Sequence, residues 1–177
     1  MPRTRPGSEE LLQEAYVAAT ALDEKSLRNL TLSSWAARVW EKELRGLPLE
    51  NQEAALAWCM RQHEEWRNFW DRLNHPRTAD PVRSTSVLVH IYNDAAVKFQ
   101  LDNQNPPEIV DLFQTMRRNR FTEIDAMHVI AFVMQEQTWH ARDTNSDFNI
   151  KQYLERAKAY VEDVLQHPEL LRSLRFT

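Results

Sequence analysis

The fold is decided by three consecutive segments, TSVLVHIYNDAAVKFQL (residues 85–101), NPPEIVDLFQTMRR (105–118) and TEIDAMHVIAFVMQEQTWHAR (122–142). Apolar residues recur in each at the three- and four-residue spacing of one α-helical face. The first segment carries two such stripes, one through Val87 and Val97 and the other through Leu88 and Phe99. A helix with two apolar faces has neighbours on both sides. We therefore predict that residues 86–101 form the central helix of an all-α protein.

The rest of the chain fits the same fold class. Helical spacing of apolar residues predicts further helices that begin near residues 8, 33, 51 and 150, and the one from Asn51 is expected to run unbroken to Asn74. No segment shows the alternation of apolar and polar residues that is typical of a strand. We predict a single all-α domain over residues 1–177, a bundle of about seven to eight helices. Residues 1–7 are expected to be a disordered lead-in.

Composition excludes several functional classes. The chain has 177 residues and only two glycines, Gly7 and Gly46, so glycine-rich phosphate-binding loops are excluded. Its 22 basic and 26 acidic side chains disfavour nucleic-acid binding. Neither a signal peptide nor a membrane-spanning run occurs in the sequence, so we expect a cytoplasmic protein without a membrane partner. A protein partner and the oligomeric state stay open. The single cysteine, Cys59, lies in an apolar run and is predicted to be a buried thiol.

The candidate functional residues are polar side chains on apolar helical faces. His63, His90 and His128 belong to three different predicted helices, and Asp94 follows His90 by one helical turn. If these helices converge, imidazoles and a carboxylate could bind zinc, manganese or ferrous iron in the bundle core. The alternative is a set of core histidines hydrogen-bonded to their neighbours. The absence of a spacing motif such as His-Glu-x-x-His favours this second interpretation.

Two other features are interpreted as structural. The basic run MRRNR, residues 116–120, is typical of a solvated helix C-terminus, which the helix dipole favours, rather than of a phosphate site. Trp66, Trp70 and Trp139 have core spacing and are predicted to be buried.

Patches along most of the chain carry a resemblance to a known family. They are VWEKELRGLPLENQEAALAW, QHEEW, SVLVHIYNDAAVKFQL with PPEI, AMHVIAFVMQEQTWHA and YLERAK. In this order and spacing they resemble a domain-of-unknown-function family of small, all-helical bacterial proteins. That family has three His-x-x-x-His pairs, which together look like metal ligands on neighbouring helices. The resemblance implies no established activity.

This chain departs from the family pattern at one member of each pair. The retained histidines are His63, His90 and His128, and the partner positions hold Arg67, Asp94 and Ile124. If the pairs converge, Arg67 and Asp94 face one another as opposite charges. We therefore predict a buried ion pair between Arg67 and Asp94 that replaces part of a metal centre.

Two functional hypotheses follow. The first is a non-catalytic interaction or scaffold module with a buried cluster of His63, Arg67, His90, Asp94 and His128, and no cofactor. On this hypothesis Arg67 repels a cation and competes for Asp94, so the protein holds less than about one equivalent of Zn, Mn or Fe. The alternative is a metal-dependent enzyme, hydrolytic or redox, with His90, Asp94 and His128 as ligands and His63 as a further one. The sequence identifies no catalytic nucleophile or base, and whether the protein is an enzyme stays open.

Overall fold

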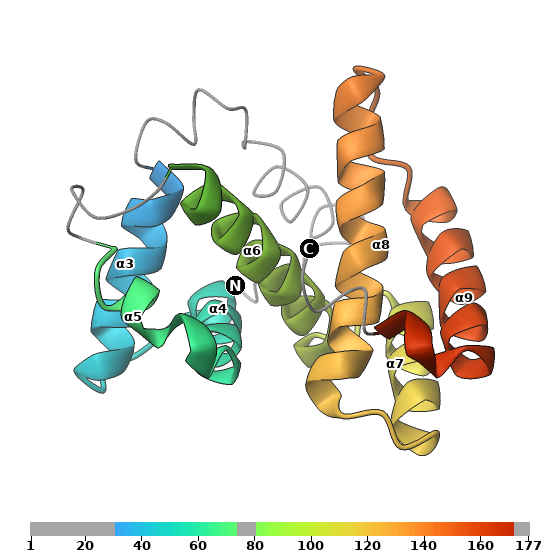
Figure 1. Cartoon of the computed structure of the whole chain (residues 1–177), viewed down its shortest axis with the longest axis horizontal. Helices are drawn as coiled ribbons and strands as arrows, with labels where there is room; N and C mark the ends of the chain where they lie inside the picture. The colour runs from blue at the N-terminus through green and yellow to red at the C-terminus, as the bar shows by residue number, and fades with distance from the viewer. Residues whose placement is uncertain (1–30, 74–80, 172–177) are drawn as a thin grey trace, which may run out of the picture.

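A computed structural model describes residues 31–73 and 81–171 (Figure 1). The helices in this part are α3 (Thr31–Leu44), α4 (Asn51–Gln62), α5 (Arg67–Trp70), α6 (Pro81–Asp102), α7 (Pro107–Arg118), α8 (Glu123–Asp143) and α9 (Ile150–Gln166), with short 3₁₀ helices η1 (Glu64–Trp66) and η2 (Pro168–Leu170). The described ranges contain no strand, so the predicted all-α class is confirmed. The predicted lead-in and the helix expected near residue 8 lie outside these ranges.

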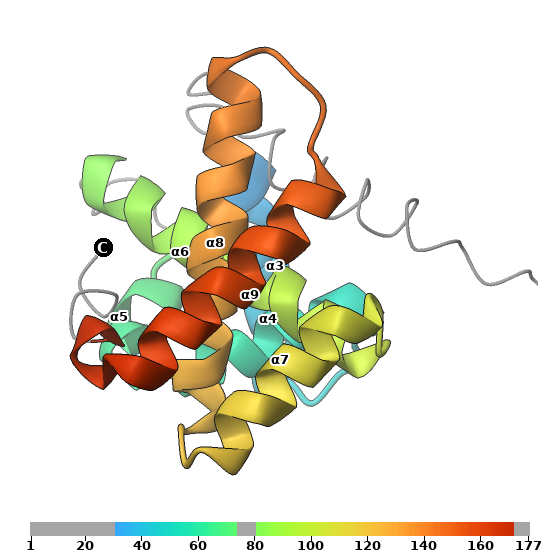
Figure 2. The ribbon, with the colours of Figure 1, turned by 90° about the vertical axis from the view of Figure 1, so that its right-hand side faces the viewer.

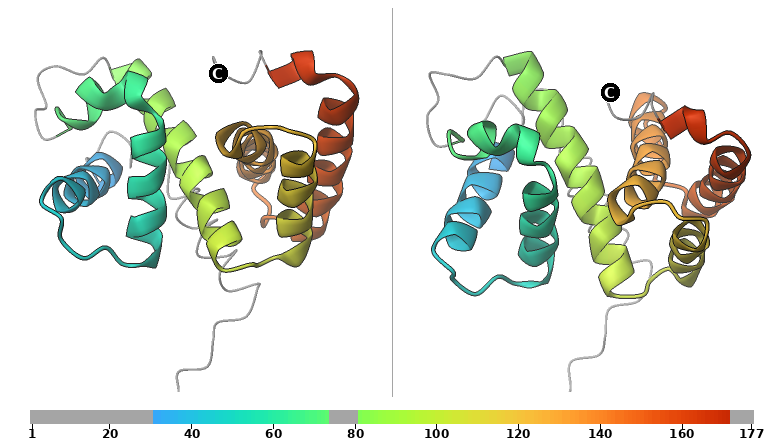
Figure 3. Two further views of the ribbon diagram at one scale, coloured as in Figure 1. Left: turned by 90° about the horizontal axis from the view of Figure 1, so that it is seen from below. Right: turned by 60° about the horizontal axis from the view of Figure 1, so that its bottom comes forward.

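Helix α6 is the centre of the bundle, as its two apolar stripes predict. Helices α3, α4 and α5 lie on one side of it and α7, α8 and α9 on the other (Figures 1 and 3). Helices α4 and α8 pack directly against it, and Val87, Val97, Leu88 and Phe99 are all buried. The helix starts at Pro81, earlier than predicted, because proline fits a first turn that needs no backbone N–H.

The core of the described residues consists of two clusters of buried side chains. Its main cluster draws buried side chains from every helix between α3 and α9, and Cys59 belongs to it as predicted. A second, smaller cluster joins α7, α8 and α9. Figure 2 shows α9 crossing the outer face of this half. Trp139, expected in the core, is 51% exposed instead. No helix of the described residues has the length and apolar character to cross a membrane.

The helix predicted from Asn51 to Asn74 is broken at His63, so that prediction is wrong. Helix α4 ends at Gln62, and His63 has φ −101° and ψ 67°, outside the helical region. The chain then makes the tight turn η1 before α5 begins. The segment QHEEW contains neither proline nor glycine, so no local signal marks the break. It coincides instead with the tertiary contacts that the His63 ring makes.

Candidate metal centre

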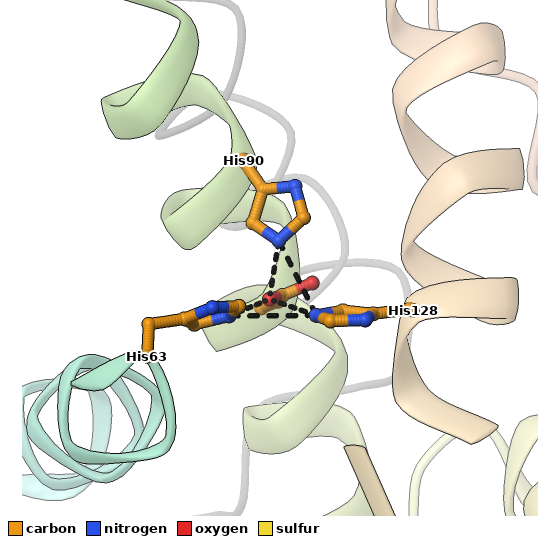
Figure 4. Close-up of side chains that lie close together, drawn as sticks. His63, His90 and His128 are labelled. Atoms are coloured by element: carbon orange, nitrogen blue, oxygen red, sulfur yellow. Dashed lines mark hydrogen bonds and ion pairs between the residues drawn. The ribbon is translucent and has the colours of Figure 1, made fainter. Parts of the chain in front are cut away.

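The break at α4 brings His63 to two other helices. His63 follows the last residue of α4, His90 and Asp94 lie one turn apart on α6, and His128 lies on α8. The three imidazole rings point toward one another (Figure 4). The Asp94 carboxylate oxygen Oδ2 lies 3.0 Å from His63 Nε2, 3.2 Å from His90 Nε2 and 3.1 Å from His128 Nε2. The structure thus brings together all four residues that the sequence marked as candidate ligands.

The spacing among the ring nitrogens is equally tight. His128 Nε2 lies 3.3 Å from His90 Nε2 and 3.4 Å from His63 Nε2. All four potential ligand atoms lie within 4.8 Å of one another. Ligands at the corners of a tetrahedron around zinc, with bonds of about 2.0–2.1 Å, are roughly 3.3 Å apart. The cluster therefore has the dimensions of a coordination shell.

A carboxylate outside the cluster orients one of its rings. The Nδ1 atom of His63 lies 2.9 Å from Oε1 of Glu65, and this acceptor calls for a proton on Nδ1. In the neutral ring Nε2 then has a lone pair that a cation can use, whereas in the imidazolium Nε2 donates to Asp94. A carboxylate behind a histidine is the usual partner of a metal-bound imidazole. Sequence reasoning missed Glu65, because its position depends on the break at His63.

Electrostatics make Asp94 a buried anion. Burial by itself raises the pKa of Asp94, but hydrogen bonds from His128, His63 and His90 outweigh it and hold that pKa well below its usual range. For His63, burial lowers the pKa, whereas Asp94 and Glu65 raise it by more, so the net shift is upward. The Asp94 side chain is only 1% exposed. A buried carboxylate requires a positive partner, which is either an imidazolium or a bound cation.

The surroundings of the cluster differ between its two sides. The indole of Trp66 stacks on the His63 ring, with centroids 4.5 Å apart, and meets the His90 ring edge-on. On the other side, His90, Asp94 and His128 line a small cavity that is shared with Asn93 and Gln135. The cluster is therefore covered by an aromatic wall on one side and bordered by a cavity on the other.

The predicted ion pair between Arg67 and Asp94 is wrong. Arg67 is exposed, pairs with Asp71 at 3.6 Å and lies over the Trp40 ring at 4.9 Å. Because the helix breaks at His63, Arg67 does not follow His63 on one helical face and belongs instead to the contact between α5 and α3. The third departure from the family pattern, Ile124, is half-buried near the start of α8.

The basic run at the end of α7 contacts its own helix and turn. The side chain of Arg117 donates to the carbonyl of Phe121, and Arg118 donates to the hydroxyl of Thr115 at 3.0 Å. Both arginines are exposed. These local contacts fit the prediction of a solvated helix C-terminus.

Fold and site together define a helical bundle with a buried histidine–aspartate cluster at its central helix. The model of the family described as domain of unknown function (DUF1841) matches residues 25–159, and the chain belongs to this family. No curated protein and no solved structure matches the chain. All four cluster residues lie inside the matched range. The family description states no activity, so any function has to be argued from the geometry of the cluster.

Proposed function

We propose that the protein binds one divalent transition-metal ion through the Nε2 atoms of His63, His90 and His128 and a carboxylate oxygen of Asp94. The observation that carries this proposal is the mutual spacing of the four atoms. Five of the six separations among these atoms are 3.0–3.4 Å, which matches the edges of a tetrahedral shell, and all six are within 4.8 Å. Octahedral ligands with similar bonds lie about 3.0 Å apart, so that geometry is also accessible if further ligands are added.

Hydrogen bonding alone accounts poorly for the same geometry. Each imidazole Nε2 holds either one proton or one lone pair. His128 Nε2 nevertheless has three polar neighbours within 3.4 Å, namely Asp94 Oδ2 and the Nε2 atoms of His63 and His90. One N–H satisfies only one of them. A cation between the four atoms satisfies all of their lone pairs at once.

Arg67 does not oppose a metal ion. The expectation of less than about one equivalent of metal rested on the loss of three of the six family histidines and on a guanidinium beside Asp94. Arg67 pairs with Asp71 instead, so the second of these arguments loses its premise. Three imidazoles and one carboxylate suit zinc, manganese or ferrous iron, and the near-tetrahedral spacing favours zinc.

The test is metal analysis of the full chain purified without a histidine tag. We expect about one equivalent of metal per chain after titration with zinc, manganese or ferrous iron and gel filtration. Asp94→Asn and His128→Gln, which change size little, should lose this equivalent. His140→Gln is the matched control, because His140 lies exposed on the same helix as His128.

A different result would overturn the proposal. If titration and gel filtration leave no stoichiometric metal on the wild-type chain, the cluster is a hydrogen-bonded polar core. The non-catalytic interaction or scaffold module then becomes the better hypothesis.

A further inference from the structure

The cavity beside the cluster has room for a small molecule. The volume that the centre of a water molecule can occupy in this cavity is about 20 Å³. A cavity needs roughly 10–15 Å³ on this measure to hold one water. His90, Asp94 and His128 form its inner wall. A molecule in this cavity therefore lies directly against three of the four proposed ligands.

The two most exposed of the four proposed ligands, His90 and His128, both line the cavity. The side chains of His63 and Asp94 are 5% and 1% exposed, whereas those of His90 and His128 are 18% and 12% exposed. Trp66 covers the opposite side through its stack on His63. A small molecule thus reaches the centre of the cluster from the cavity side.

Asn93, which is among the residues that line the cavity, has a buried hydrogen-bond acceptor without a partner in the described part of the chain. The buried amide of Asn93 donates from Nδ2 to the Val89 carbonyl at 2.8 Å and contacts Gln135 Oε1 at 3.4 Å. Its oxygen Oδ1 has no partner among the residues that the structure describes. A buried acceptor without a donor is costly, and a bound water is a common explanation.

We infer that the proposed metal centre has an exchangeable coordination position facing this cavity, which takes water or a small anion. Asn93 is the positioning residue for water there, because its free oxygen accepts a hydrogen bond that water donates. This inference rests on the proposed metal binding. Catalytic metal sites keep a coordination position open to ligands from solution, whereas structural metal sites are closed. An exchangeable position would place this centre in the first group.

The test uses the cobalt-loaded full chain and azide as the probe. Cobalt(II) reports changes of its ligand shell in its visible absorption bands. We expect azide to shift these bands in a saturable way. Ala131→Leu, which adds a bulky side chain to the cavity wall, should abolish the shift while cobalt stays bound at about one equivalent.

Asn93→Leu separates a positioning role from a structural one. Water can donate to the Asn93 oxygen and azide cannot, so this nearly isosteric change weakens the resident water alone. Azide should then bind up to about tenfold more tightly, the effect of one hydrogen bond. Asn68→Leu is the control, because Asn68 lies exposed on α5, and should bind azide as the wild type does.

The outcomes separate this inference from the proposal beneath it. Cobalt that binds stoichiometrically without responding to azide means a closed centre, which overturns the inference and leaves metal binding standing. Azide affinity that is unchanged or weaker in Asn93→Leu overturns the role of Asn93. A wild-type chain that binds no cobalt overturns both.

Discussion

Glu65 orients the imidazole ring of His63, one of the four residues of the cluster. Its carboxylate lies against the back of the His63 ring, so in the neutral ring the nitrogen that faces Asp94 has the lone pair that metal binding requires. Slight burial of this largely exposed side chain raises the pKa of Glu65, but the hydrogen bond with His63 lowers that pKa by more, so Glu65 is a carboxylate at neutral pH. An anionic partner raises the basicity of the imidazole and restricts its rotation. On the proposed function, a residue outside the cluster thus tunes His63 for metal binding.

Glu65→Gln should weaken zinc binding by roughly 10–100-fold, the usual effect of losing a carboxylate behind a ligating histidine. Isothermal titration with zinc measures this change. Glu64→Gln is the matched control, since Glu64 is an exposed neighbour in the same turn. Equal zinc affinity in both variants would show that Glu65 does not support the centre.

The break between α4 and α5 is the element on which the site depends. Helix α4 ends just before His63, and the His63 ring contacts Asp94 on α6 and His128 on α8. The segment after the break is anchored on α3, where the Trp40 indole Nε1 donates to Asp71 Oδ1 at 2.8 Å. Arg67 adds a contact over the same indole at 4.9 Å. Helix α3, which supplies no ligand, therefore holds the segment that follows His63.

Asp71→Ala should lower the free energy of unfolding by about 1–2 kcal/mol, because it leaves the donor of the buried Trp40 without a partner. Urea denaturation followed by circular dichroism measures this. Arg72→Ala, at an exposed neighbouring residue, should change stability by less than about 0.5 kcal/mol. Similar stability of the two variants would contradict an anchoring role for Asp71.

Across the whole molecule, the cluster joins both halves of the bundle. His63 comes from the side of α6 that carries α3, α4 and α5, and His128 comes from the side that carries α7, α8 and α9 (Figure 1). Asp94 lies between them on α6 and is almost fully buried. Without metal, the raised pKa of His63 favours an imidazolium beside this negative charge. The stability of the metal-free bundle therefore depends on the protonation of this cluster.

The metal-free protein should lose stability as pH rises above about 6.5. The raised pKa of His63 means that the folded state binds its proton more tightly than the unfolded state, whose value is 6.5. This contribution is fully present below pH 6.5 and is lost as pH rises through the folded pKa. The depressed pKa of Asp94 acts in the opposite direction, and its contribution is lost only in acid, below about pH 4.

The measurement is the thermal midpoint between pH 6 and pH 9 in the presence of a chelator. His63→Gln should flatten the decline, whereas His140→Gln, at an exposed histidine, should keep it. Saturating zinc should reverse the trend, since metal binding requires deprotonated ligands. A pH-independent midpoint in the wild-type metal-free protein would contradict the assigned charge balance.

The sequence by itself determined the fold class, the central helix and the four members of the cluster. These follow from local periodicity: residues of α6 that recur every three or four positions lie on one face, and polar residues on such a face stand out. His90 and Asp94 belong to one cluster because one helical turn separates them. That relation holds in any α-helix and needs no tertiary information.

Only the tertiary structure decided how His63, Arg67 and Glu65 are arranged. Helical spacing placed His63 and Arg67 on one face, and the break at His63 sends Arg67 to Asp71 and Trp40 and brings Glu65 behind the histidine ring. No proline or glycine signals this break, which coincides with contacts of His63 to α6 and α8, distant in sequence. Local periodicity carries no information about such contacts, so packing decided that Asp94 contacts His63 and not Arg67.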